Sequence, residues 1–121
     1  MKLQMAMLFA KDMEKMTAFY RDGLALSVLP DRSQEGWVVF DAGGAFFALH
    51  AIPEAISREI EITSPPQERG DTPIKLVFQT ADLEGVCARL SDMGAKVLPP
   101  RASGYRDAVD PEGNIFQIKG M

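Results

Sequence analysis

Few side chains in this sequence could carry out acid–base, nucleophilic or metal chemistry. His50 is the only histidine and Cys87 the only cysteine among 121 residues. His50 ends an apolar run, where it could act as a hydrogen-bonding or proton-transfer group or simply close a strand. Cys87 has no histidine near it in sequence, so we interpret it as a buried, inert thiol rather than a nucleophile. The sequence therefore predicts no catalytic residue.

One polar side chain interrupts an apolar strand near the C-terminus. The segment Asp110-Pro-Glu-Gly-Asn114 is typical of a tight turn, and residues 115–118 have the composition of a strand. Because side chains alternate along a strand, Gln117 shares one face with Ile115 and Lys119. We expect Gln117 either to have a partner or to contact a ligand.

The sequence also contains an internal repeat. Asp41 and the glycine-containing turn after it correspond to Asp110 and its turn at a shift of 69 residues. Asp12, which precedes an expected helix, corresponds to Asp82 at a shift of 70 residues. Two nearly equal shifts indicate two copies of one structural unit. An internal repeat of this kind is stronger evidence for the fold than any single predicted helix or strand.

The elements expected in each half follow the same order: strand, helix, strand, strand, strand. In the first half they span residues 2–10, 12–23, 26–29, 36–40 and 45–50; in the second they span 73–80, 82–93, 96–98, 105–109 and 115–119. Residues 51–71 are rich in proline and polar residues, and we interpret them as a linker with a helical turn at 54–58. The linker is interpreted as a surface loop, with a flap over a site as the alternative. The modules are therefore predicted at residues 1–50 and 72–121.

Composition excludes several classes of protein. The formal net charge of −4 and the lack of a basic cluster argue against a nucleic-acid surface. No apolar run is long enough for a membrane span, and the N-terminus lacks the layout of a signal peptide. A single cysteine cannot form an internal disulfide, so we expect a cytoplasmic protein.

The helix motif and the late turn resemble those of a known superfamily. The segment Asp12-Met-Glu-Lys-Met-Thr-Ala-Phe-Tyr-Arg-Asp-Gly-Leu24, together with Asp110-Pro-Glu-Gly-Asn114, is similar to the vicinal oxygen chelate superfamily of glyoxalase I, bleomycin-resistance proteins and extradiol dioxygenases. The resemblance spans essentially the whole chain. It implies an α+β fold in which two βαβββ modules form a curved mixed sheet with a central cleft, and it implies a homodimer.

The resemblance also implies where a metal would bind. Metal-using members of the superfamily hold the ion with nitrogen and oxygen donors on the first and last strand of each module, and the repeat places those positions here at Met5, Ala48, Lys75 and Gln117. Met5 offers only a thioether, Ala48 only a methyl group and Lys75 an ammonium. Gln117 is therefore the only one of the four with an oxygen donor. We therefore predict no metal and no cofactor.

The alternating pattern instead predicts an apolar cleft surface with a few polar side chains, as in a small-molecule site. Phe9 and Phe46 belong to this surface, Met5 and Met7 adapt their shape to a ligand, and Trp37 adds stacking area, although its face is open at this stage. We expect the ligand-binding residues to be Met5, Met7, Phe9, Trp37, Phe46, Ala48, His50, Lys75 and Gln117.

Three functions fit this pattern. The first is non-catalytic binding of a small amphipathic or aromatic molecule in the inter-sheet cleft of a dimer, similar to the drug-sequestering, bleomycin-resistance type. The second is a glyoxalase-like lyase or isomerase, or a dioxygenase-type enzyme, with a degenerate or relocated metal site. The third is an interaction domain whose cleft is filled by its own side chains. We prefer the first because the implied metal positions lack donors.

Overall fold

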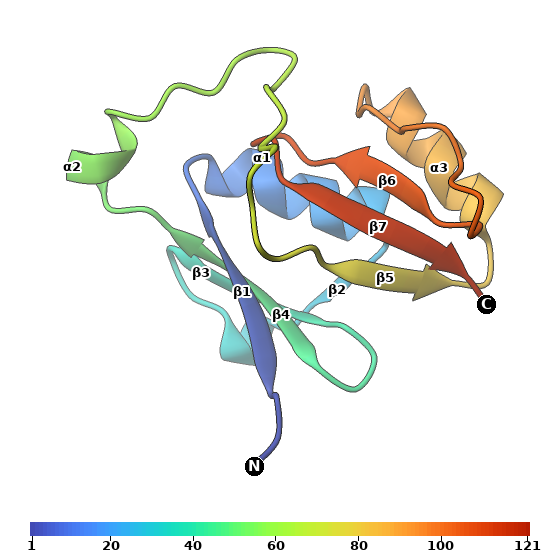
Figure 1. Ribbon diagram of the computed structural model, residues 1–121. Coiled ribbons are helices and arrows are strands. Elements are labelled where there is room, and N and C mark those ends of the chain that lie inside the picture. Colours follow the sequence, from blue (N-terminus) through green and yellow to red (C-terminus); the bar gives the residue numbers. More distant parts are fainter. The chain divides into compact units, whose positions relative to one another are not determined.

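The chain folds into two compact units, each containing one mixed β-sheet. The computed structural model describes all residues, 1–121, and divides them into unit 1, Met1–Glu61, and unit 2, Ile62–Met121. Figure 1 follows the elements of both units along the chain. None of the helices is long and apolar enough to span a membrane.

Unit 1 has a four-stranded sheet in the order β1-β4-β3-β2. Strand β1 pairs in parallel with β4, and the other neighbours are antiparallel. The Asp12 side chain caps the first helix by accepting a hydrogen bond of 3.0 Å from the Lys15 amide. The elements of unit 1 are β1 (Met5–Ala10), α1 (Met13–Ala18), the π-helical turn η1 (Phe19–Gly23), β2 (Ser27–Val28), the 3₁₀ turn η2 (Pro30–Arg32), β3 (Trp37–Asp41), β4 (Phe46–Ala51) and α2 (Glu54–Ser57).

The core of unit 1 lies between α1 with η1 and one face of the sheet. Phe47 and Leu49 on β4 are buried, and the Phe47 ring lies 4.8 Å from the Tyr20 ring of η1. Because side chains alternate along a strand, Phe46, Ala48 and His50 lie on the opposite face. The packing of α1 and η1 on one face therefore determines which residues the other face presents.

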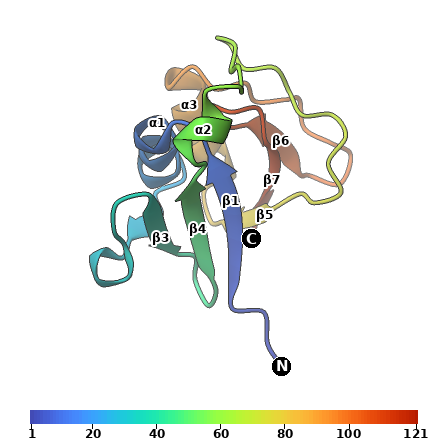
Figure 2. The same ribbon diagram turned by 90° about the vertical axis from the view of Figure 1, so that its left-hand side faces the viewer.

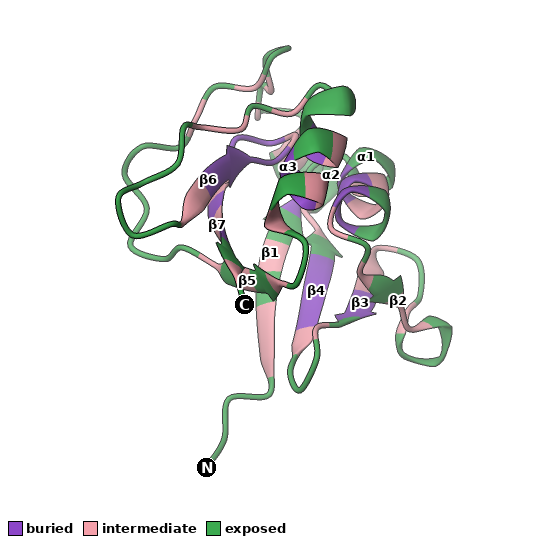
Figure 3. Cartoon of the chain, turned by 90° about the vertical axis from the view of Figure 1, so that its right-hand side faces the viewer, coloured by how far each residue is buried: buried purple, intermediate pink, exposed green.

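Unit 2 repeats this plan with a three-stranded sheet in the order β5-β7-β6. Strand β5 is parallel to β7. The Asp82 side chain caps the helix of unit 2 by accepting a hydrogen bond of 2.9 Å from the Gly85 amide. Buried side chains of the helix, including Leu90, and of the last strand, including Phe116, form its core. Figure 3 marks buried residues of β6 and β7 in purple. The elements of unit 2 are β5 (Val77–Thr80), α3 (Leu83–Asp92), β6 (Arg106–Val109) and β7 (Ile115–Gly120).

The register of the two parallel strand pairs matches the repeat in the sequence. Met7 is opposite Ala48 in unit 1, and Val77 is opposite Gln117 in unit 2. Shifting the first pair by the 70 and 69 residues of the repeat gives the second pair. The predicted α+β fold with two βαβββ modules is confirmed at the level of two small mixed sheets.

One predicted strand, residues 96–98, is wrong. Only Val97 forms a bridge, to Ala108 of β6, although Leu98 N still donates to Asp107 O at 2.8 Å. Pro99 and Pro100 follow immediately and have no N–H to continue the ladder. The first strands of the modules also begin later than predicted, at Met5 and at Val77.

The turn after β6 is held together by one buried carboxylate. Asp110 is fully buried, and its Oδ1 accepts from the Glu112 and Asn114 amides at 2.9 and 3.0 Å while Oδ2 accepts from Asn114 Nδ2 at 2.8 Å. Gly113 has φ +87°, and a Cβ there would lie 2.1 Å from the Gln67 carbonyl oxygen. The turn thus fixes both the β6–β7 hairpin and the segment around Gln67.

The equivalent aspartates of the two turns provide a matched pair of substitutions. We expect Asp110→Ala to lower the free energy of unfolding by about 2–4 kcal/mol, because buried donors lose a charged acceptor. Asp41→Ala should cost less than about 1 kcal/mol, because Asp41 is exposed and accepts one bond, from the Gly43 amide at 2.9 Å. Urea unfolding followed by circular dichroism measures both values, and equal losses would contradict this explanation.

Candidate functional site

Seven of the nine predicted ligand-binding residues lie on one face of the unit 1 sheet. In the β1–β4 pair, Met5 is opposite Phe46 and Phe9 is opposite His50, and β3 places Trp37 opposite His50. The register therefore assigns Trp37, whose face the sequence left open. We call this surface the β1/β4 face, composed of Met5, Met7, Phe9, Trp37, Phe46, Ala48 and His50. Figure 2 shows the strands β1, β4 and β3 that carry it.

This face exposes several large apolar side chains to solvent. The Phe9 side chain is 55% exposed and Met7 is 40% exposed, while Met5, Trp37 and Phe46 are half-buried. Ala48 is completely buried, so it supports its neighbours without offering contact area of its own. The exposed apolar area of this face therefore comes mainly from Phe9 and Met7.

His50 lies between two aromatic rings on this face. Its imidazole stacks on Phe9 with centroids 5.5 Å apart and meets the edge of Trp37 at 5.3 Å. His50 is exposed, and its imidazole contacts these two rings without a side-chain hydrogen bond. These three rings form a continuous aromatic surface at the end of β4, which suits stacking on a flat ligand better than abstraction of a proton by an oriented base.

At the other end of β4 the face borders a hollow of about 530 Å³. The guanidinium of Arg32 lies 4.4 Å from the centroid of the Phe46 ring, a cation–π contact. Leu3 and Leu29 provide apolar walls, and Lys2 and Asp41 add charges. The β1/β4 face thus has an aromatic end and a charged end.

The other two predicted residues, Lys75 and Gln117, lie in unit 2 beside a carboxylate that the sequence analysis missed. Asp107 is 4% exposed and faces Gln117 across the β6–β7 pair. Its Oδ2 accepts three hydrogen bonds. Two come from Arg101, from Nη2 at 2.6 Å and from Nε at 3.1 Å, and the third comes from Lys75 Nζ at 3.4 Å. We call Lys75, Arg101, Asp107 and Gln117 the Asp107 cluster.

The charge state of Asp107 follows from two opposing effects. Burial raises the pKa of this carboxyl, but hydrogen bonds from Arg101, Gln117 and Lys75 outweigh burial and leave the pKa below its usual range. Asp107 is therefore ionised at neutral pH and holds both cations in place.

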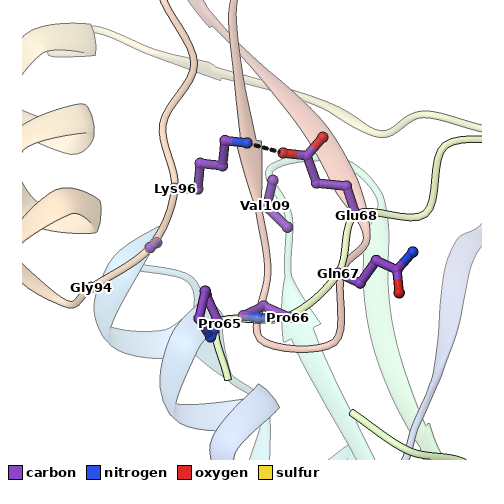
Figure 4. Close-up of a pocket in the computed structure, with 8 residues that line it drawn as sticks. Pro65, Pro66, Gln67, Glu68, Gly94, Lys96 and Val109 are labelled. Carbon is purple, nitrogen blue, oxygen red and sulfur yellow. Dashed lines mark ion pairs between the residues drawn. The ribbon is translucent and has the colours of Figure 1, made fainter. Parts of the chain in front are cut away.

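A second hollow, of about 590 Å³, lies elsewhere in unit 2 and contains none of the predicted site residues. Pro65 and Pro66 line one side of it, and an ion pair between Lys96 and Glu68 crosses it (Figure 4). Its lining combines apolar groups, including Val109, with this charge pair.

Cys87 is buried in α3, as the sequence predicted. Burial raises the pKa of its thiol, with smaller effects from Arg106, which lowers it, and Glu84, which raises it. A thiol protonated at neutral pH is a poor nucleophile, so Cys87 belongs to the core.

Asp107, Arg101 and Arg32 are the residues that sequence reasoning missed. Asp107 was detectable, because pairing the expected strands 105–109 and 115–119 about their turn places it opposite Gln117. Arg101 follows two prolines and Arg32 lies in a short 3₁₀ turn, so no strand periodicity predicts where either side chain points.

Comparison with known proteins identifies the family. The sequence profile of the glyoxalase-like domain matches residues 5–119. No curated protein sequence matches the chain. The chain therefore belongs to the glyoxalase-like domain family, within the vicinal oxygen chelate superfamily that its motifs predicted.

Solved structures with the same fold cover almost the whole chain. A glyoxalase/bleomycin resistance protein/dioxygenase family enzyme from Burkholderia phytofirmans is 18% identical, with a TM-score of 0.73 over 99% of this chain and 98% of that one. The fosfomycin resistance protein FosX from Listeria monocytogenes is 16% identical, with a TM-score of 0.71 over 100% and 93%. A protein of unknown function from Agrobacterium tumefaciens is 25% identical, with a TM-score of 0.71 over 100% and 94%. At these identities the similarity shows the fold.

The residues at the four implied metal positions do not fit a metal ion. Met5 offers a thioether and Ala48 no donor, while the Lys75 ammonium is paired with Asp107. Gln117 alone has a suitable oxygen, and no group of three His, Cys, Asp or Glu side chains that could hold a metal occurs anywhere in the chain. A catalytic zinc site needs about three protein ligands, so we derive no metal-dependent step.

Metal binding provides a direct test of this donor set. After dialysis against Mn²⁺, Zn²⁺, Ni²⁺ or Co²⁺ and removal of free ions, we expect elemental analysis to find well below one ion per chain. A chelator should leave the melting temperature unchanged, because no folding free energy depends on a bound ion. A stoichiometric metal that resists dialysis would show that the donors have been misassigned.

The depressed pKa of Asp107 predicts an acid-sensitive contribution to stability. Its folded pKa lies below the unfolded value of about 3.9, so the contribution is complete above that value and is lost as the pH falls through the folded pKa. The Asp107→Asn variant should therefore have a lower free energy of unfolding than the natural protein at pH 7. The difference between the two free energies should become smaller as the pH falls towards 3.

Urea unfolding across this pH range measures the difference. Asp22→Asn is the matched control, because Asp22 also pairs with an arginine, Arg21 at 2.8 Å, but in an exposed and therefore screened position. It should change stability little at any pH. If the loss of unfolding free energy in Asp107→Asn stays constant with pH, the stabilising role of ionised Asp107 would be contradicted.

Proposed function

We propose that this protein binds and sequesters a small amphipathic or aromatic molecule without catalysis, and that it does so as a homodimer. The ligand would contact the β1/β4 face. The observation that carries the proposal is the exposed aromatic surface formed by Phe9, His50 and Trp37. The ring centroids of Phe9 and His50 are 5.5 Å apart, and those of His50 and Trp37 are 5.3 Å apart.

An apolar ligand would gain from this surface in two ways. Removing Phe9 and Met7 from water contributes about 25 cal/mol for each Å² of apolar area that the ligand covers. A flat aromatic ligand gains a further 0.5–1.5 kcal/mol or so per ring by stacking in an offset or edge-on arrangement. Met5 and Met7 are flexible and polarisable, so they adapt to the outline of the ligand.

The polar part of an amphipathic ligand would extend towards the hollow beside Phe46. Arg32 already lies against the Phe46 ring there, and Lys2 provides a second cation. A ligand with an apolar body and a polar or anionic end matches this order of side chains along β4. Such a combination of apolar walls and few polar groups is typical of small-molecule sites.

The class of ligand is suggested by similarity to resistance proteins. The motifs resemble those of the bleomycin-resistance group, and FosX from Listeria monocytogenes, a fosfomycin resistance protein, shares the fold. Antibiotics and chemically similar compounds are therefore the first ligands to examine. The alternative, a glyoxalase-like or dioxygenase-type enzyme, requires donors that the four metal positions do not supply.

Trp37 is the only tryptophan, so its fluorescence reports on the β1/β4 face directly. We expect at least one compound from a panel of amphipathic antibiotics and aromatic acids to change Trp37 emission saturably and to raise the melting temperature. Phe9→Ala should weaken that ligand by about 1.5–3 kcal/mol, or roughly 10- to 100-fold in Kd, through lost burial and stacking.

Ile56→Ala is the control, because Ile56 is 57% exposed on α2 and does not belong to the β1/β4 face. It should leave the Kd unchanged. If no compound shifts either signal, or if both substitutions weaken binding equally, the proposed surface is wrong. Sedimentation of the free and liganded protein tests the homodimer in the same samples.

A further inference from the structure

The Asp107 cluster contains an excess of positive charge around a buried carboxylate. Asp107 carries one negative charge, whereas Lys75 and Arg101 carry one positive charge each. The hydrogen bonds from both cations converge on Asp107 Oδ2. Lys119 lies on the same face of the sheet, next to Gln117, with its ammonium 5.8 Å from the Tyr105 ring. This local excess contrasts with the net charge of −4 for the whole chain.

An ordinary surface ion pair in the same chain shows what is unusual here. Arg21 and Asp22 form a neutral pair in which both side chains are about half exposed. In the Asp107 cluster the carboxylate side chain is only 6% exposed, while the Lys75 and Arg101 side chains remain 37% and 55% exposed. Burying a carboxylate costs several kcal/mol unless its partners compensate, so this arrangement is not a loose surface contact.

The buried carboxylate fixes two cations whose hydrogen-bonding capacity is only partly used. Lys75 directs one N–H to Asp107, and Arg101 binds through Nε and Nη2. An ammonium and a guanidinium both have further donors, which here remain open to solvent. Holding them in advance reduces the ordering cost that an incoming anion would otherwise have to overcome.

We propose that the Asp107 cluster is an oxyanion site, which binds the carboxylate or phosphate group of a small molecule between Lys75 Nζ and the Arg101 guanidinium. Arginine matches the planar geometry of such groups, and lysine adds a compact charge. Asp107 is a positioning residue that does not touch the anion, and the Gln117 amide lies beside it. The site lies within unit 2 and does not depend on the ligand proposed for the β1/β4 face.

Inorganic phosphate and acetate are the probes for this site, each compared with chloride at equal ionic strength. We expect amide resonances of Arg101, Asp107 and Gln117 in ¹H–¹⁵N spectra to shift saturably with at least one of the two oxyanions and not with chloride. Saturation by phosphate alone or by acetate alone would show which head group the site takes. Lys75→Gln and Arg101→Gln should each raise the Kd by about tenfold or more, since each removes a charged hydrogen bond.

Arg21→Gln removes the same charge from the exposed Arg21–Asp22 pair and should change the Kd less than about twofold, since distant exposed charges are screened. Arg101→Gln leaves Asp107 with fewer partners, so the double substitution Arg101→Gln with Asp107→Asn provides a folded variant that should also fail to bind. Shifts that do not saturate, that occur equally with chloride, or that Arg21→Gln reduces as much as Arg101→Gln would overturn the proposal. Trp37 fluorescence reads the other site, so the two proposals succeed or fail separately.

Discussion

The parallel pairing of β1 with β4 determines which side chains the first half of this protein presents on the open face of its sheet. Its register places Met5, Met7 and Phe9 beside Phe46, Ala48 and His50, and the packing of Phe47 against Tyr20 holds the other face of β4 in the core. A slip of one residue in either strand would exchange the faces. The exposed aromatic surface is therefore a consequence of core packing on the opposite side of the sheet.

The two units share a plan but present different chemistry. The pair Met7–Ala48 in unit 1 and the pair Val77–Gln117 in unit 2 occupy equivalent places in the parallel strand pairs. Around the first pair the neighbours are aromatic and apolar, whereas around the second they are Lys75, Asp107 and Arg101. The four positions that the resemblance implies for metal ligands therefore fall on an apolar face in one unit and in an ion-pair cluster in the other.

The sequence predicted the repeated fold well, because alternation, helix caps and two turns occur at nearly constant shifts. It also predicted that Met5, Met7, Phe9, Phe46, Ala48 and His50 share a face, since strand parity depends on spacing alone, but it left the face of Trp37 open. It failed for residues 96–98, where proline ends the pairing, and for Arg101 and Arg32, whose positions depend on loops. Asp107 is an intermediate case, because strand pairing places it opposite Gln117, whereas its partner Arg101 lies in a loop whose side-chain direction no periodicity predicts.

Methyl NMR of the seven methionines tests the central claim that unit 1 binds its ligand on the β1/β4 face. Met5 and Met7 lie on that face, Met16 is buried in α1 behind the sheet, and Met93 is 43% exposed after α3 in unit 2. With a compound that changes Trp37 emission, the account predicts shifts of the Met5 and Met7 methyl resonances, with Met16 and Met93 unchanged. Shifts at Met93 or Met16 with Met5 and Met7 unaffected would contradict it.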